Sequence, residues 1–209
     1  MKAIIATLLL FISLLSVTAF AEPDVDALEL EGARVWQMLP RPSEMIRYPG
    51  ADGLAHYGLT KEPQIVSVDR LPGGEALEVV VSRKGTNIYS AGIQAKNQIK
   101  ISKGDVIFTA IWIRATELPE GLSETTTPIA LQEAKEPYDT WAIEQAKVGQ
   151  EWRLHFVYGT APEKYKKEGM TLSLQIAGEK QTLEVGPVYM MNMGQGEVDP
   201  SAMPRNVVR

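Results

Sequence analysis

The chain of 209 residues contains no cysteine and only two histidines, His56 and His155. Without cysteine it can form no disulfide, no thiolate zinc site and no cysteine nucleophile. Two histidines far apart in the sequence do not make a metal-ligand cluster, and no H-E-x-x-H pattern occurs. G-x-S-x-G, the P-loop and G-x-G-x-x-G are also absent. The sequence therefore carries no motif of a serine hydrolase, a zinc hydrolase or a nucleotide-binding protein.

Basic residues are outnumbered as well. There are 21 Lys and Arg against 26 Asp and Glu, a net charge of −5, and the isoelectric point is near 5.2. This charge balance gives no sign of the basic surface that binds nucleic-acid phosphates, and we expect no nucleic-acid partner. Hydrophobic residues make up 44% and charged residues 22% of the chain, as in ordinary soluble globular proteins. This length suits one domain or a small pair.

The first residues have the layout of an export signal. Lys2 precedes an almost continuous apolar run, Ala3–Val17, and Ala19-Phe20-Ala21 follows as an A-x-A cleavage site before Glu22. No later run is long and apolar enough to span a bilayer. We expect cleavage after Ala21, no membrane span in the mature chain, and a periplasmic or secreted location.

From residue 65 onward the chain falls into short apolar runs separated by glycine and proline turns. This pattern is typical of an all-β sandwich or barrel. The sequence therefore predicts an all-β fold with strands at Ile65–Val68, Ala76–Val81, Ile88–Ala95, Gln98–Ile101, Asp105–Ala115, Pro128–Gln132, Thr140–Val148, Glu151–Tyr158, Met170–Ala177 and Leu183–Met193.

The rest of the chain is less regular. Prolines and glycines repeatedly interrupt residues 22–64, which we expect to form an irregular segment that packs on the sandwich after one strand near Arg34–Met38. Residues 65–194 form the predicted β-sandwich, and residues 195–209 are expected to be a flexible tail. No internal repeat and no second domain are evident.

Two of the predicted strands carry a polar or charged residue whose surroundings can be inferred from the pattern of the strand. Glu151–Tyr158 alternates, which favours Trp152 in a buried core and His155 on the opposite, outward face. Asp105–Ala115 is apolar on both faces, as in a central strand, yet Arg114 stands near its end. A half-buried arginine needs a partner, either a protein carboxylate or an oxygen of a ligand.

Planar polar and aromatic side chains remain as candidate site residues. A sugar has an apolar CH face, which an aromatic ring can cover, and a rim of hydroxyls, which Arg and Gln can bind through paired donors and acceptors. Each such residue also has an ordinary structural explanation. The candidates on outward or edge positions are Tyr89, Arg114, Gln132, Tyr138, Trp141 and Gln175.

A family resemblance rests on the order of several short motifs. The run Ile101-Ser102-Lys103-Gly104-Asp105 leads into Ile111-Trp112-Ile113-Arg114-Ala115, and together they resemble a strand pair of jelly-roll carbohydrate-binding modules. These modules belong to the galactose-binding-like superfamily, of the type attached to xylanases and β-glucanases. The later motifs keep the family order: Ile129-Ala130-Leu131-Gln132, Pro137-Tyr138, Gly149-Gln150-Glu151-Trp152, Leu172-Ser173-Leu174-Gln175-Ile176 and Leu183-Glu184-Val185-Gly186-Pro187-Val188-Tyr189.

The resemblance covers about residues 65–194 and implies a two-sheet jelly roll that holds a polysaccharide or oligosaccharide on its concave face, without catalysis. Such modules often hold a structural calcium, whose ligands the sequence does not identify; the family's aspartate after the Val-Tyr pair is replaced here by Met190-Met191-Asn192. No other cofactor is expected. Two alternatives stay open: a periplasmic structural or protein-interaction domain with the same fold, and a hydrolase with an unrecognised carboxylate pair.

Overall fold

The computed structural model describes residues 37, 39–41, 43–47, 49–69 and 71–206. The expected signal segment, and all of the strand expected at Arg34–Met38 except Gln37, lie outside this part of the chain. Eleven strands and two short 3₁₀ helices fill it, so the all-β prediction is confirmed. They are β1 Glu44–Arg47, β2 Ala55–Tyr57, β3 Gln64–Ser67, β4 Glu75–Val81, η1 Ile88–Ser90, β5 Gly92–Lys96, β6 Asp105–Glu117, β7 Glu124–Glu133, β8 Thr140–Gly149, β9 Arg153–Thr160, β10 Met170–Gln175, β11 Gln181–Gln195 and η2 Pro200–Ala202.

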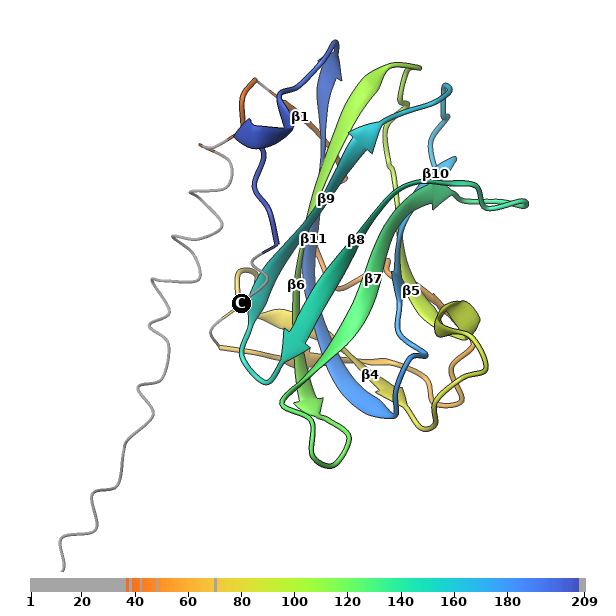
Figure 1. The fold of residues 1–209 in the computed structure, drawn as a ribbon, viewed down its shortest axis with the longest axis vertical. Coiled ribbons are helices and arrows are strands. Elements are labelled where there is room, and N and C mark those ends of the chain that lie inside the picture. The colour runs from red at the N-terminus through yellow and green to blue at the C-terminus, as the bar shows by residue number, and fades with distance from the viewer. Residues whose placement is uncertain (1–36, 38, 42, 48, 70, 207–209) are drawn as a thin grey trace, which may run out of the picture.

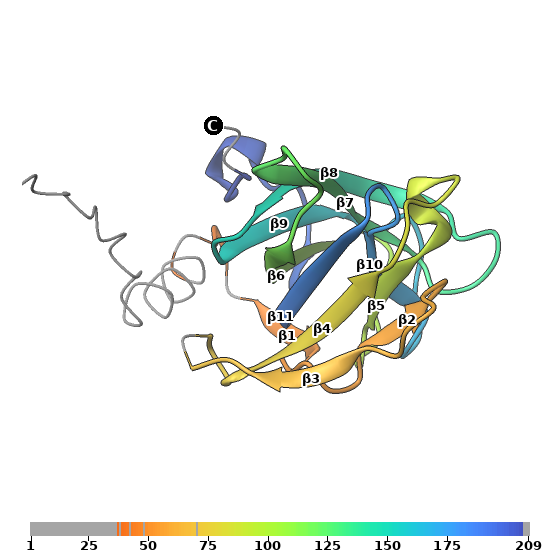
Figure 2. The same cartoon turned by 90° about the horizontal axis from the view of Figure 1, so that it is seen from below.

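The strands form two antiparallel sheets packed face to face. One follows the order β3-β4-β11-β6-β9, with β1 also paired to β11, and the other follows β2-β5-β10-β7-β8. Figure 1 shows the strands of the second sheet side by side, and Figure 2 shows the two layers from below. The described helices are too short and polar to cross a membrane. The two-sheet sandwich implied by the family resemblance is therefore confirmed.

The main core lies between the sheets. Ile129 and Leu131 of β7 and Leu172 and Leu174 of β10 are almost fully buried, and in β10 they alternate with Thr, Ser and Gln. They meet the inward side chains of β4, β6 and β11, among them Val185. Because successive residues of a strand point to opposite faces, the intervening polar residues of β7 and β10 lie on the outer face of the five-stranded sheet.

The six-stranded sheet is apolar on its outer face too. Phe108 and Trp112 of β6, Phe156 of β9 and Trp152, which directly precedes β9, form a second cluster there with Met203. The rings of Phe108 and Phe156 stack with centroids 5.8 Å apart. The sheet therefore carries hydrophobic packing on both sides, and β6 is a central strand between β11 and β9, as predicted.

The faces of β9 are the reverse of those expected. Trp152 is buried as predicted, but in the outer cluster rather than between the sheets. His155 shares the inward face with Val157 and is only 5% exposed, so its assignment to an outward, solvated face was wrong. Alternation in the sequence shows which side chains share a face of a strand, but it does not show which face is covered by other parts of the protein. In β9 both faces are covered.

The segment 22–64 contributes two strands that the sequence did not predict. β1 pairs with β11, and β2 pairs with β5. Strands of four and three residues between prolines and glycines are too short to show an alternation pattern. In the other direction, Ile88–Ser90 is a 3₁₀ turn and Gln98–Ile101 keeps only an isolated bridge between Ile101 and Tyr165.

The C-terminal segment differs from the flexible tail that we expected, as far as the structure describes it. Met203 is buried, and the side chain of Asn206 bonds the main chain of β9. The amide nitrogen of Phe156 donates to Asn206 Oδ1 (2.8 Å), and Asn206 Nδ2 donates to the carbonyl oxygen of Phe156 (3.0 Å). Residues 198–206 therefore pack on the sandwich as part of the fold.

Candidate functional site: a groove on the five-stranded sheet

A groove of about 650 Å³ lies on the outer face of the five-stranded sheet. Strands β2, β5, β7, β8 and β10 supply its floor and sides, and η1 and the β7–β8 hairpin supply residues at its rim. Its lining is aromatic and amide-rich: Tyr57, Tyr89, Gln94, Gln132, Ala134, Pro137, Tyr138, Thr140 and Gln175. Four of the six predicted site residues therefore come together: Tyr89, Gln132, Tyr138 and Gln175.

Strand register places the polar side chains along the groove. Thr171 of β10 pairs with Gln132 of β7, and two residues further on Ser173 pairs with Gln94 of β5. Gln175 then pairs with Gly92. Each step of two residues advances about 7 Å along the strand on the same face. Amides thus stand at three successive levels of the sheet.

The three glutamine amides of the groove have no hydrogen-bond partner among the described residues. Gln94, Gln132 and Gln175 take part in none of the side-chain bonds that hold the sandwich together. Between them, the hydroxyl oxygen of Ser173 is buried and unbonded. Buried or half-buried polar groups normally find partners. The three glutamine amides therefore present unused donors and acceptors to a molecule lying in the groove, whereas the Ser173 hydroxyl lies buried beneath them.

Tyr57 forms part of the floor because the residue beside it is a glycine. Gly92 is its cross-strand neighbour on β5, and a Cβ there would come within 2.5 Å of the Tyr57 hydroxyl oxygen and 2.7 Å of the Leu174 carbonyl oxygen. The missing side chain lets the tyrosine ring lie close to the sheet. The ring thus covers the main chain of β5 at Gly92 and forms part of the lining of the groove.

Two further tyrosines stand at the rim with much of their surface in solvent. Tyr89, in η1, is 59% exposed, and Tyr138, in the β7–β8 hairpin, is 47% exposed. The hairpin is fixed by a bond from the Tyr138 amide to the Lys135 carbonyl (2.8 Å) and one from the Glu133 amide to the Asp139 carbonyl (3.0 Å). Tyr138 has a positive φ of 62°, which is uncommon for a bulky residue and directs the ring toward solvent rather than core.

Arg114 does not belong to this groove. It lies on the outer face of the other sheet, with Trp112 and Trp152, on the far side of the sandwich core. Its Nε donates to Glu184 Oε2 at 2.6 Å, and its guanidinium carbon lies 5.0 Å from the Trp152 ring centroid. Of the two partners considered for this arginine, a carboxylate of the protein is the correct one.

Trp141 also points away from the groove. A register irregularity between Leu131 and Gln132 separates it from the regular pairing of β7 and β8. Its ring packs on the edge of the core and stacks on Tyr165, with centroids 6.5 Å apart. Its neighbour Thr140 lines the groove instead. Trp141, predicted as a binding platform, is therefore not among the residues that line this groove.

Sequence reasoning missed three polar or aromatic lining residues, Tyr57, Gln94 and Thr140, besides Ala134 and Pro137. Gln94 could have been found, because it alternates with Ile93 and Ala95, which are buried. Thr140 is the outward neighbour of Trp141 and was passed over for the larger ring. Tyr57 lies in the segment expected to be irregular, so nothing in its surroundings indicated a strand.

No group of three or more Asp, Glu or His side chains that could hold a metal ion occurs among the described residues. Asn192, near the position where the resembled family often has aspartate, donates through Nδ2 to Asp105 Oδ2 at 2.7 Å. The same carboxylate oxygen accepts the amide of Ser102 at 2.8 Å. Hydrogen bonds thus satisfy the one buried carboxylate at this place.

Comparison by sequence finds no matching protein family and no matching characterised protein. Comparison by structure finds many chains. The N-terminal cellulose-binding domain of Cellulomonas fimi β-1,4-glucanase C is 18% identical, with a TM-score of 0.52 over 75% of this chain and 99% of that domain. The CBM22-1 xylan-binding domain of Paenibacillus barcinonensis Xyn10C is 12% identical, with a TM-score of 0.52 over 76% of this chain and all of that domain.

Larger enzymes that contain such modules also match. A structure of the Clostridium thermocellum xylanase 10B, comprising CBM22-1 and GH10 modules with bound xylohexaose, is 14% identical with a TM-score of 0.53 over 72% of this chain. This chain spans only 29% of that one. At these identities the likeness is one of fold. The chain has the jelly-roll fold of carbohydrate-binding modules, as the sequence motifs implied.

Proposed function

We propose that this chain is an exported, non-catalytic glycan-binding protein that holds a polysaccharide or oligosaccharide in the groove of the five-stranded sheet. The observation that carries the proposal is the set of unpartnered amides, Gln94, Gln132 and Gln175, along a groove with tyrosine rings at its floor and rim. The amides make none of the side-chain hydrogen bonds that hold the sandwich together. Together, the amides and the rings match the two surfaces of a sugar ring.

The chemistry of the lining favours a sugar chain over other ligands. A tyrosine ring packs against the CH face of a pyranose and keeps its hydroxyl in water, while an amide can donate to one sugar hydroxyl and accept from the next. The groove is elongated along the strands, with amides at three levels between Tyr138 at one rim and Tyr89 at the other. Such a succession suits a linear chain of similar units.

The same lining argues against hydrolysis. Cleavage of a glycosidic bond ordinarily needs two carboxyl groups that flank the bond, one of them protonated. No aspartate, glutamate or histidine is among the residues that line the groove. We therefore propose binding without turnover.

The structural neighbours indicate where to begin the search for the ligand. The names of two of them describe cellulose binding and xylan binding. Uncharged plant polysaccharides are accordingly the first candidates for this chain, and the lining of the groove, which has no charged side chain, agrees with them. Export rests on the residues before Glu22, which lie outside the described part of the chain.

Affinity electrophoresis and calorimetry test the proposal. The mature protein is run against xylan, cellulose derivatives, mixed-linkage β-glucan and laminarin, with the double variant Gln132→Ala, Gln175→Ala as the groove-deficient protein. We expect binding to at least one polymer and its loss in the double variant, at unchanged melting temperature. Absence of binding to every polymer would contradict the proposal and favour a structural or protein-interaction domain. Release of reducing ends would contradict its non-catalytic part.

A further inference from the structure

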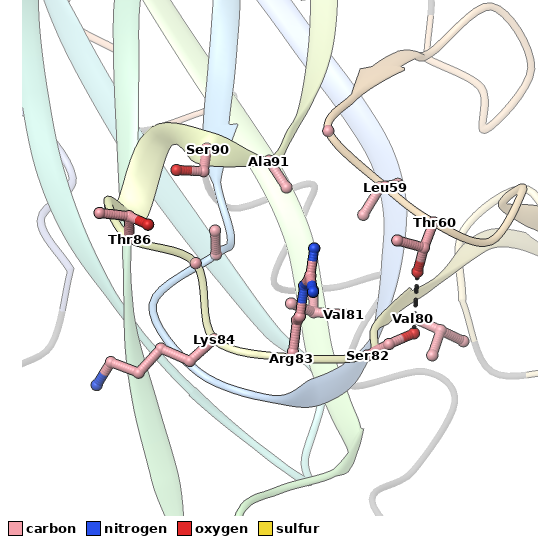
Figure 3. A pocket seen from close by; sticks show the side chains of 13 residues that line it. Leu59, Thr60, Val80, Val81, Ser82, Arg83, Lys84, Thr86, Ser90 and Ala91 are labelled. Atoms are coloured by element: carbon pink, nitrogen blue, oxygen red, sulfur yellow. Dashed lines mark hydrogen bonds between the residues drawn. The ribbon is translucent and has the colours of Figure 1, made fainter.

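A second hollow lies at the end of the sandwich, next to the groove. It measures about 560 Å³ and is lined by residues 58–60, 80–86, 90, 91 and 177. Figure 3 shows Arg83 rising in its middle, with Leu59 and Thr60 on one side and Ser90 and Ala91 on the other. Two of the lining residues, Arg83 and Lys84, are basic and none is acidic. The hollow is thus locally positive in a chain whose net charge is −5.

The two basic residues are not equivalent. Lys84 points away from the hollow in Figure 3, and its Nζ lies 2.6 Å from Glu179 Oε1, so its charge is already neutralised. Arg83 has no ion pair and no hydrogen bond within the described part of the chain. A guanidinium presents its donors in a planar fork that suits a carboxylate or a sulfate. One unneutralised cation therefore faces an open space.

Hydroxyl-bearing side chains line the same hollow. The hydroxyls of Thr60 and Ser82 lie 3.2 Å apart and bond each other, and Thr86 also lines the hollow. One hydroxyl of the bonded pair keeps a proton that it can donate to an anion. The lining therefore offers hydroxyl donors besides Arg83 and contains no carboxylate.

The hollow and the groove share a wall. Tyr57 and Tyr89 line the groove, and the residues that follow them in the chain, Gly58 and Ser90, line the hollow. The wall is thin, because a Cβ on Gly58 would come within 1.9 Å of the Ser90 carbonyl oxygen. The Tyr57 and Tyr89 side of the groove is therefore the side that borders the hollow.

We propose that the hollow is an anion subsite, in which Arg83 binds a carboxylate or sulfate group carried by a sugar chain lying in the groove. The inference rests on the proposed function and adds to it: the sugars held in the groove are uncharged, and the same chain carries a carboxylate or sulfate group at the hollow. Since the protein as a whole is negative, general electrostatic attraction does not produce such a preference. Only a local cation does.

The test uses matched pairs of polymers. A glucuronic-acid-bearing xylan is compared with the same xylan after reduction of its carboxyl groups, and a sulfated galactan is compared with its desulfated form. Dissociation constants are measured for the wild type, for Arg83→Gln and for the control Lys84→Gln, which removes the same charge from a side chain that points elsewhere. The melting temperature and the affinity for the reduced xylan report whether each variant is folded.

We expect the wild type to bind at least one acidic polymer about tenfold more tightly than its neutral form, or about 1.4 kcal/mol. Arg83→Gln should abolish this preference and leave binding of the neutral form unchanged, whereas Lys84→Gln should keep the preference. Preference for the xylan alone identifies a carboxylate, and preference for the galactan alone identifies a sulfate. Equal binding of both members of each pair, or a preference that survives Arg83→Gln, would overturn the subsite while the groove stands. No binding of any of the four polymers would overturn the subsite, and the groove would fall with it only if the neutral polymers of the wider panel are not bound either.

Discussion

Arg114 and Glu184 face each other on neighbouring strands β6 and β11, with Nε and Oε2 2.6 Å apart. The glutamate side chain is 10% exposed and the arginine 31%. The guanidinium also lies over the Trp152 ring. The pair therefore fixes the outer face of the six-stranded sheet.

Replacement of this arginine should destabilise the fold without affecting ligand binding. Arg114→Ala removes a charged hydrogen bond and leaves Glu184 unpaired, which costs about 1.5–3 kcal/mol of unfolding free energy. Urea denaturation measures the loss, and the affinity for a bound polymer serves as control. Weakened binding at full stability would instead place Arg114 in a ligand site.

Tyr138→Ala should have the opposite profile. The ring is half exposed at the rim of the groove and contributes little to the core, so the unfolding free energy should change by less than about 0.5 kcal/mol. Loss of a stacking platform should weaken polysaccharide binding about tenfold or more. Calorimetry on the polymer that the wild type binds measures this.

Trp141→Ala is the contrasting variant. It is expected to lower the free energy of unfolding by about 3 kcal/mol or more, because the ring packs on Tyr165 and the core.

Gly92→Ala should disturb the floor of the groove from beneath. The added methyl group would collide with the Tyr57 ring and the Leu174 carbonyl oxygen, and main chain cannot move aside as a side chain can. We expect lower affinity together with a lower melting temperature. If Tyr57→Ala is introduced as well, the clash with the tyrosine ring disappears and only the clash with the Leu174 carbonyl oxygen remains, so part of the lost stability should return. No recovery in the double variant would show that the clash with Leu174 dominates.

His155 makes stability depend on pH. Burial, followed by the nearby charge of Arg153, lowers its pKa from 6.5 to about 4. The unfolded chain therefore binds a proton between these values and the folded chain does not. Stability is complete above about pH 6.5 and falls by about 3 kcal/mol as the pH drops to about 4.

Denaturation curves at pH 7 and pH 4.5 measure this dependence. His155→Leu should flatten it, while His56→Gln, at an exposed histidine bonded to Glu62, should leave it unchanged. Equal slopes in the wild type and in His155→Leu would assign the acid sensitivity to other groups.

The mature chain is expected to begin at Glu22. Ala19-Phe20-Ala21 provides small residues at both positions that signal peptidase reads. N-terminal sequencing of protein recovered from the cell envelope or the medium measures the cleavage point. An intact Met1 in a membrane fraction would contradict it, and Ala21→Leu should cause the precursor to accumulate.

The sequence was informative where a strand alternates and where only one of its faces is covered. In β10, Leu172 and Leu174 lie in the core, and Gln175, predicted from the sequence as a site residue, lines the groove on the other face. In β9 the same kind of pattern misled, because Trp152 and His155 are both buried, one on each side of the sheet. A strand pattern records side-chain polarity, and only the tertiary structure decides what covers each face.

Partners distant in sequence were the second limit. The sequence indicated that Arg114 needs an oppositely charged partner, but it did not identify the partner. Glu184 lies 70 positions later in the chain, and nothing in its local sequence distinguishes it from other acidic residues. Tyr57 and Gln94 approach each other only because β2 adds to the edge of β5. Four groove residues were found from residue type and motif order, and those that depend on an unrecognised strand were not.

The bond between Asn206 and the main chain of Phe156 has a practical consequence. Strand β9 ends its sheet, and free main-chain groups at such an edge are a template for pairing with another molecule. A single amide side chain occupies both the donor and the acceptor of Phe156, while Met203 screens the apolar rings beside it. A protein truncated before residue 206 would thus expose unpaired main-chain groups of β9 and the apolar rings beside them. We expect such a protein to precipitate or to associate with other copies of itself. Purification tags are better joined after Arg209 through a spacer than substituted for these last residues.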